Sequence, residues 1–439
     1  MNLLKEIPTR LWLFLFGVHT VYFLIAYLFG NIYTVDSYGY LHQAANLWNH
    51  SSWYAEDWQA PVLIDYFSFR PPLYACFVIC CKFISDSNYF ILIIQNLISI
   101  ANLLLLYNIY QRCGLNKKNS MYALMVVMVF YPAQFVHANL VMTEIIFQGL
   151  LLLLFYRTLI FVQSVRLINV WWLSMLLSIT LLTKPVIILF SIAIGLLVFY
   201  NAYQEKKLYL IYPLLMVPLT FHLLCLQNKH STGYYHFSSV KPIFHLKYNA
   251  KYTLLAKFGE YYADSTISAV MHQVNSSPSY RLRYETMQQQ ANQVIMQYPF
   301  HYAKLFAKGC IAFFIDPGRY DLFHLFGVND AGFNGLYHEF NVHGIAALSN
   351  FIKQAPLGLL LILLLNICWN ILIAVCFVWF LFYKNAPIFL RVLVFVFVAY
   401  IALATGILGL SRYRVPVYPI ISIAMVFAYQ HFYLSRKHV

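Results

Sequence analysis

Ten apolar segments, each long enough to cross a lipid bilayer as a helix, constrain this chain more than any other feature. Crossing the hydrocarbon core takes about 20 apolar residues. The segments are residues 11–30, 88–110, 120–138, 141–161, 168–185, 186–203, 208–226, 355–382, 388–410 and 415–433. The composition agrees, because 61% of the residues are hydrophobic and 10% are charged, whereas soluble proteins carry about 25% charged residues. The sequence therefore predicts an all-α polytopic membrane protein.

Two shorter apolar stretches, residues 72–84 and 300–315, decide the topology, because each extra crossing reverses the side of everything that follows. Basic residues gather on the cytoplasmic side of membrane helices. If neither stretch crosses, the following basic positions share one side: Lys5, Arg10, Arg112, Lys117, Lys118, Arg166, Lys206, Lys207, Lys384, Arg391, Arg436 and Lys437. We therefore predict about ten transmembrane helices with cytoplasmic ends, and interfacial helices at the two short stretches.

This topology predicts two large extracytoplasmic loops, residues 31–87 and 227–354, on a single membrane domain that comprises residues 1–439. The second loop would form a cap. The first apolar segment follows Lys5 and Arg10 and lacks a small-residue cleavage site, which is typical of an uncleaved first helix. The chain carries 29 Lys and Arg against 15 Asp and Glu. Cytoplasmic anchoring and an anionic, phosphate-bearing lipid explain this excess, and no basic soluble domain remains that would bind nucleic acid.

Asp36 lies in the aromatic stretch Tyr33–Tyr40, immediately after the first apolar segment. Aromatic surroundings would desolvate the carboxylate and raise its pKa, although an acid at this place can also be simply solvated. The aromatic side chains, Tyr40 among them, fit either an interfacial belt or stacking against a sugar. We interpret Asp36 as a candidate base that meets a lipid-linked substrate at the membrane surface.

Further along the first loop are an acidic pair, Glu56 and Asp57, and the segment Arg70-Pro71-Pro72. The acidic pair could orient an acceptor, bind a metal or keep the loop soluble. Proline suits the first turn of a helix and restricts the residue before it, so Arg70 is held in a defined place at a helix start. Its guanidinium could face a phosphate.

Three short outward turns carry the other candidate residues. His137 and Glu144 flank the first of these turns, and Glu144 falls in the first turn of a membrane helix, where the helix dipole can stabilise a carboxylate. An ionisable group at membrane depth nevertheless suggests function. Lys184, in the second turn, lies on the outer side, whereas basic residues gather on the cytoplasmic side. It therefore needs an anionic partner, which could be Glu144, Asp36 or a phosphate.

The third turn contains Arg412, Tyr413 and Arg414. Arginine suits phosphate, because its planar fork donates hydrogen bonds in pairs. Together with Arg70 and Lys184, this turn predicts a phosphate-binding set of outward cations at helix ends. The eight cysteines show no metal or redox spacing. Phosphate-loop, dinucleotide and hydrolase motifs are absent from the sequence, so no motif demands a cofactor.

The order of these outward features resembles the GT-C superfamily of membrane glycosyltransferases, in particular the branch of protein O-mannosyltransferases and aminoarabinose transferases. The features are Asp36, Arg70-Pro-Pro-Leu-Tyr74, Pro132 with Thr143-Glu144, Thr183-Lys184-Pro185, Asp316-Pro-Gly-Arg-Tyr-Asp321 and Arg412-Tyr-Arg-Val-Pro416. The resemblance implies a GT-C-like fold, a polyprenyl-phosphate sugar as donor and Asp36 as catalytic base. Many members carry adjacent acids in the first loop, whereas Ser37 follows Asp36 here, which leaves the use of a divalent metal and the type of acceptor open.

The sequence thus predicts an inverting transfer of a sugar from a polyprenyl-phosphate donor to a hydroxyl of a lipid, glycan or protein acceptor. The reaction would occur at the extracytoplasmic face, which in a bacterial inner membrane is the periplasmic side. Two alternatives stay open. A polysaccharide polymerase or ligase would use His324, His338 and His343 in the late loop. A transporter of lipid-linked sugars would need ionisable residues at mid-membrane depth.

Overall fold

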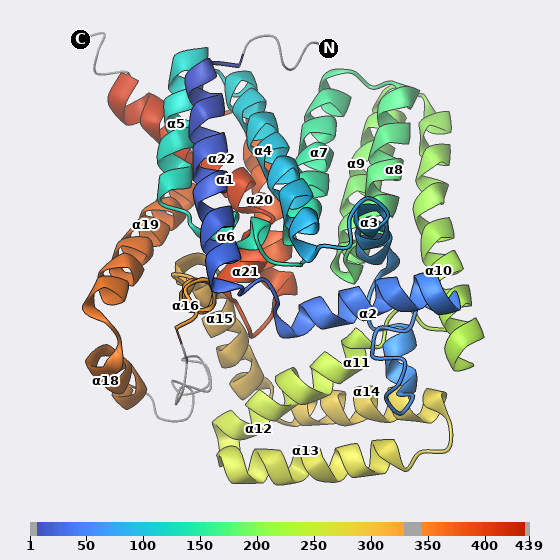
Figure 1. Ribbon diagram of the computed structural model, residues 1–439. Coiled ribbons are helices and arrows are strands. Elements are labelled where there is room, and N and C mark those ends of the chain that lie inside the picture. The colour runs from blue at the N-terminus through green and yellow to red at the C-terminus, as the bar shows by residue number, and fades with distance from the viewer. Residues whose placement is uncertain (1–6, 329–344, 435–439) are drawn as a thin grey trace.

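The computed structural model of this chain describes residues 7–328 and 345–434, and the regular elements within these ranges are helices. Upright helices form a bundle, and a second group of helices lies across one end of it (Figure 1). The start of α1 (Thr9–Phe29) and the final helical turn η5 (Gln430–Leu434) lie at the opposite end of the bundle. An all-helical membrane-type architecture therefore agrees with the sequence.

The upright helices include the long apolar helices of the described chain. They are α1, α4 (Asn88–Arg112), α5 (Lys117–Val129), α7 (Glu144–Gln163), α8 (Leu167–Leu181), α9 (Ile188–Gln204), α10 (Met216–Thr232), α19 (Leu357–Phe382), α20 (Ile388–Ala404) and α22 (Tyr418–Tyr429). Within the described residues, six helices are long and apolar enough to cross a membrane. The prediction of about ten crossings stays a prediction, because several of the upright helices are shorter than a full span.

Helix ends depart from the predicted segments where proline or glycine intervenes. The segment 120–138 is not one helix: α5 ends at Val129 and α6 (Ala133–Ala138) begins after Pro132. Proline lacks the N–H that would continue the helix. The segment 388–410 ends early at Ala404, because Gly406 and Gly409 adopt positive φ angles of 61° and 52°. That turn leads into α21 (Ser411–Arg414).

The two predicted outer loops are largely helical. Residues 31–87 contain α2 (Val35–His50), η1 (Ile64–Phe67) and α3 (Pro72–Lys82). Residues 227–354 contain α11 (Val240–Phe244), η4 (His245–Ala250), α12 (Lys251–Phe258), α13 (Glu260–Asn275), α14 (Tyr280–Gln297), α15 (Pro299–Ile315), α16 (Arg319–Leu325) and α18 (Ile345–Gln354). Short helical turns η2 (Pro185–Ile187) and η3 (Leu208–Leu215) precede α9 and α10.

Helix α2 and the cap helices α11 to α14 lie across the bundle at the end away from the start of α1 (Figure 1). The bundle itself is held by a continuous apolar core in which Tyr131 and Tyr418 stack with ring centroids 3.4 Å apart. The helix ends beneath the cap are the places where polar residues can gather without facing lipid.

The predicted orientation can be tested by labelling exposed positions at the two ends of the bundle. Asp57 belongs to the first outer loop and Lys206 to the turn after α9, and both side chains are exposed. We expect Asp57→Cys in intact cells to react with a membrane-impermeant maleimide, and Lys206→Cys to react only after the membrane is opened. The parent protein, with its free cysteines, gives the background. Labelling of position 206 from outside would reverse the topology.

Candidate active site

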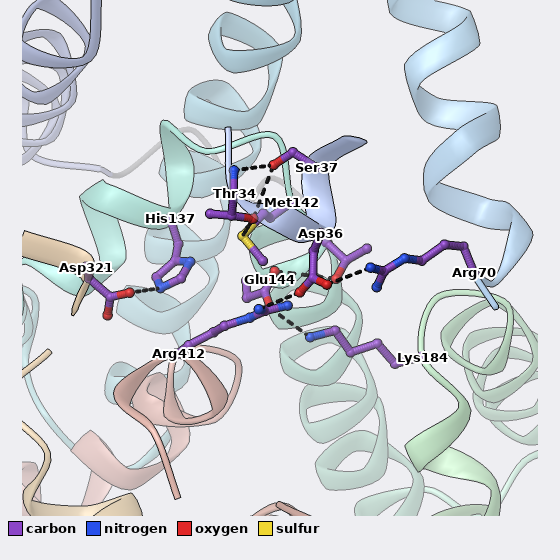
Figure 2. A network of polar contacts seen from close by, with 11 residues as sticks. Thr34, Asp36, Ser37, Arg70, His137, Met142, Glu144, Lys184, Asp321 and Arg412 are labelled. Atoms are coloured by element: carbon purple, nitrogen blue, oxygen red, sulfur yellow. Dashed lines mark hydrogen bonds and ion pairs between the residues drawn. The ribbon is translucent and has the colours of Figure 1, made fainter. Parts of the chain in front are cut away.

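Five charged side chains from five different segments meet beneath the cap (Figure 2). They are Asp36 at the start of α2, Arg70 before α3, Glu144 at the start of α7, Lys184 before η2 and Arg412 in α21. All five were candidates from the sequence, although they lie up to several hundred positions apart in the chain. Their convergence defines a candidate site at the bundle end that faces the cap helices.

Asp36 lies in the first turn of α2 and not in a loop, which corrects the expectation from the sequence. The helix begins after Thr34, where the Ser37 hydroxyl accepts a hydrogen bond of 2.9 Å from the Thr34 backbone N–H. The segment before the helix is tied to the α6–α7 connection, because the backbone N–H of Val141 donates to the carbonyl of Ile32 at 3.0 Å. This contact brings the starts of α2 and α7 together.

The carboxylate of Asp36 is shared by two guanidinium groups. Its Oδ1 lies 2.6 Å from Nη2 of Arg70, and its Oδ2 lies 2.5 Å from Nη1 of Arg412. Burial opposes the charged form, but Arg412 and Arg70 outweigh it and lower the pKa of Asp36 below its ordinary value. The expected rise of this pKa is therefore wrong, because the sequence could not show which cations reach the carboxylate.

Several contacts hold Arg70 in place. Pro71 caps α3 and Pro72 occupies its first turn, as the proline pair predicts. The Gln43 side chain donates to the Arg70 carbonyl at 2.8 Å, and the guanidinium lies 4.8 Å from the centroid of the Tyr40 ring, a cation–π distance. Its Nε is buried and has no hydrogen-bond partner in the described part of the chain. One donor of Arg70 is therefore left for an additional acceptor.

Glu144 is fully buried at the first position of α7. Its Oε1 lies 3.0 Å from Nζ of Lys184 and 2.8 Å from Nε of Arg412. Of the partners considered for Lys184, the structure thus shows Glu144. Arg412 is the centre of the arrangement, because it contacts both Glu144 and Asp36.

The cluster carries an excess of positive charge. Arg70, Lys184 and Arg412 face two carboxylates, so one positive charge remains. Each cation has a carboxylate partner, but two carboxylates are shared among three cations, and among the described residues no third carboxylate forms an ion pair with them. The arrangement therefore suits an anion with one or two charges, such as a phosphate ester.

A cavity of about 390 Å³ adjoins Arg70. Its wall is mostly apolar and includes Trp53, Pro71, Leu182 and Leu224. Leucines on the same helix as Leu224 are exposed at the surface of the bundle, for example Leu223 with 57% of its area accessible. The cavity therefore joins a cationic end to a surface that the sequence assigns to lipid.

The other predicted site residues lie outside the cluster of five. Tyr413 is partly buried next to the Arg412 guanidinium, which is 5.8 Å from its ring centroid. Arg414 points the other way and donates to the carbonyls of Phe313 and Asp316 at 3.1 and 2.9 Å. It holds the backbone and does not face the site.

The acidic pair of the first loop is remote as well. Glu56 lies 3.5 Å from Nδ1 of His42, with about a third of each side chain exposed. Asp57 is exposed and accepts a hydrogen bond of 3.1 Å from the backbone N–H of Gln59. Neither residue contacts Asp36 in the structure, and their role as orienting groups stays a prediction.

His137 is buried beside the cluster, with its Nε2 3.2 Å from Oδ1 of Asp321 in α16 (Figure 2). The two side chains are in direct contact at this distance. Reasoning from the sequence did not assign a role to Asp321 or to its neighbour Ser411. The sequence shows Asp321 as an acid in a short proline- and glycine-rich segment, and this pattern does not reveal which residues it contacts.

No group of three or more metal-binding side chains occurs among residues 7–328 and 345–434. Within those ranges Asp36 and Glu144 contact cationic side chains. His324 is partly buried in α16, whereas His338 and His343 lie outside the described residues. Participation of a divalent metal stays open.

Comparison with known proteins gives little beyond this geometry. No family model matches the chain, and no curated protein matches it. Among solved structures, the chain is similar to ArnT from Cupriavidus metallidurans in the apo state, with 10% sequence identity and a TM-score of 0.38. The match covers 95% of this chain and 78% of that chain. A likeness at this level does not establish a shared fold or activity.

Removal of the Glu144 charge tests how far the cluster supports the fold. Glu144→Gln leaves Lys184 and Arg412 with less compensation in a buried place, and breaking such a pair costs about 3 kcal/mol. We expect a lower free energy of unfolding by that amount in a detergent denaturation series. Glu56→Gln, in a half-exposed pair, is the control and should change stability by less than about 0.5 kcal/mol. Equal stability of both variants would contradict a buried network.

The lowered pKa of Asp36 predicts a pH dependence with a definite sign. A carboxyl whose pKa falls on folding contributes its full stability above the unfolded pKa and loses it as pH drops through the folded value. Its ordinary value is 3.8. We expect the difference in thermal midpoint between the parent protein and Asp36→Asn to stay constant from about pH 8 to about pH 5. It should shrink only below the ordinary pKa; a loss already at neutral pH would contradict the assignment.

Proposed function

We propose that this protein is an integral membrane glycosyltransferase. It transfers a sugar from a polyprenyl-phosphate donor to an acceptor hydroxyl at the extracytoplasmic face, with inversion at the anomeric carbon and with Asp36 as base. The observation that carries the proposal is the partly buried cluster in which three cations surround two carboxylates. A phosphate ester would supply the missing negative charge.

The donors of the cluster fit a departing phosphate. Arg70 and Arg412 reach Asp36 from opposite sides, and Lys184 reaches Glu144 (Figure 2). During transfer, negative charge develops on the phosphate oxygen as its bond to the sugar breaks. Fixed cations in a site shielded from water stabilise such charge far better than water does.

The reaction itself needs few groups. The acceptor oxygen attacks the anomeric carbon, the bond between that carbon and the phosphate oxygen breaks, and its electron pair leaves with the phosphate. Asp36 accepts the proton of the hydroxyl. Since a phosphate ester is already a good leaving group, no general acid is required. Attack from the side opposite the phosphate inverts the anomeric centre.

The pairing of Asp36 with two guanidinium groups suggests an order for donor binding and activation of the base. Arg412 and Arg70 lower the pKa of Asp36, which makes its carboxylate weakly basic. A donor phosphate competes for the same guanidinium groups, and each contact that Asp36 loses raises its pKa toward the ordinary value. The base therefore becomes stronger when the donor is bound.

The adjoining cavity supports a lipid-linked donor. It begins at Arg70, continues along apolar side chains such as Leu182 and Leu224, and lies next to helix surfaces that expose leucine. A long isoprenoid chain has apolar surface that such a wall can bury. A water-soluble nucleotide sugar would leave this wall without an equivalent partner.

Asp36→Asn tests the base. With a radiolabelled polyprenyl-phosphate sugar and a suitable acceptor, we expect transfer to fall by about a hundredfold or more, while binding of polyprenyl phosphate persists. Asp86→Asn, which changes an exposed acid of the same loop, is the control and should retain activity. Full activity of Asp36→Asn together with loss in His324→Ala would instead favour a polymerase or ligase.

Lys184→Met and Arg412→Met test the phosphate contacts. Each variant removes a cation from the cluster, so we expect the affinity for polyprenyl phosphate to drop about tenfold, as for a lost charge-assisted hydrogen bond. The affinity for the uncharged polyprenol should not change. Arg281→Met removes an exposed cation from the cap and serves as the control. Unchanged phosphate affinity in both cluster variants would contradict the proposed function.

A further inference from the structure

Arg412 contacts both carboxylates of the site, yet it belongs to a helix of only four residues, α21. So short a helix cannot hold a side chain in place by its own hydrogen bonds. Its neighbours Ser411 and Arg414 are both buried, with 3% of their areas accessible, and contact the segment 313–321, which comprises the end of α15, the connection and the start of α16. The position of Arg412 therefore depends on that segment.

Asp316, after the end of α15, and Asp321, in α16, hold Ser411 from both of its polar groups. The backbone N–H of Ser411 donates to Oδ2 of Asp316 at 2.6 Å, and its hydroxyl donates to Oδ2 of Asp321 at 2.7 Å. The Asp316 carbonyl accepts hydrogen bonds from Arg414 and from Asn370 at 2.9 Å each. Charge-assisted hydrogen bonds of this kind are stronger than neutral ones.

Backbone packing adds a second restraint on the same turn. A Cβ added to Gly409 would lie 1.9 Å from the carbonyl oxygen of Gly309 in α15, and one added to Gly309 would lie 2.2 Å from the carbonyl of Gly406. Only glycine permits such an approach of two backbones. The turn before Arg412 therefore rests directly on α15, and its freedom to shift is small.

Asp321 differs from Asp316 because it also faces the other half of the site. Its Oδ1 lies 3.2 Å from Nε2 of His137 in α6, and α6 leads within a few residues to Glu144 (Figure 2). One buried carboxylate, with 3% of its area accessible, thus touches the turn that carries Arg412 and the segment that carries Glu144. Among the described residues, no arginine or lysine forms an ion pair with Asp321.

We propose that Asp321 is a positioning residue: through Ser411 it sets the place of Arg412, and through His137 it keeps Arg412 in register with Glu144. This inference rests on the proposed function, in which Arg412 binds the donor phosphate. Asp321 itself does not touch the substrate. Burial opposes the charged form of Asp321, but His137 and the Ser411 hydroxyl outweigh it and lower the pKa of this carboxyl. The contact therefore involves an ionised group.

The experiment is a double-mutant cycle on the full-length protein in lipid bicelles. The probe is a fluorescent polyprenyl phosphate, and the matching polyprenol reports binding that does not involve the phosphate. We expect Asp321→Ala and Ser411→Ala each to weaken the phosphate-dependent affinity about tenfold, within the range of coupled neighbours. In the Arg412→Met background, the same changes should add no further loss. Polyprenol affinity should stay constant throughout.

The double-mutant cycle separates an effect on the position of Arg412 from a general loss of folding. Asp264→Ala removes a carboxylate that pairs with Lys251 in the cap and should leave phosphate affinity unchanged. If Asp321→Ala does not fold, Asp321→Asn, which can still accept from Ser411, should fold and show a smaller loss. An Asp321 effect that persists in the Arg412→Met background, or no effect at all, overturns the inference. No effect of Arg412→Met itself instead overturns the proposed function.

Discussion

The bridge that Arg412 makes between Asp36 and Glu144 is the interaction on which the site depends. It joins the start of α2, the start of α7 and the turn before α22, which are far apart in the chain. Buried charges persist only when their partners are close and well oriented. Glu144 lies at the start of an apolar helix and needs partners, and these partners, Lys184 and Arg412, come from two different outward turns. The cap helices lie over this cluster.

The three cations of the site outnumber the two carboxylates that they contact. Both carboxylates are already shared among the cations that contact them. An arriving anion does not need to create a new pocket; it exchanges with Asp36 for contacts that already exist. Binding and activation of the base are then one event, because every guanidinium contact that moves to the phosphate is lost by the carboxylate.

Much of the site could be predicted from particular residues. The sequence indicated Glu144 at a helix start, Arg70 before two prolines, and a lysine that needs an anionic partner. These features are predictable because helix ends, proline and charge bias act locally. Other features could not be read. The pKa direction of Asp36 depends on which cations touch it. The break at Pro132 and the early end of α20 changed helix lengths, although apolarity had suggested uninterrupted segments.

The sequence by itself determined that the chain folds as apolar helices with charged residues confined to their ends, since hydrophobic length and charge placement are properties of consecutive residues. Only the tertiary structure decided which of those end residues meet. Arg412 and Arg414 looked equivalent, but side chains two positions apart on a helix point to opposite faces, so one enters the site and the other holds the α15 backbone. The pairing of Asp321 with Ser411 and His137 was equally hidden, because contacts between distant segments depend on packing.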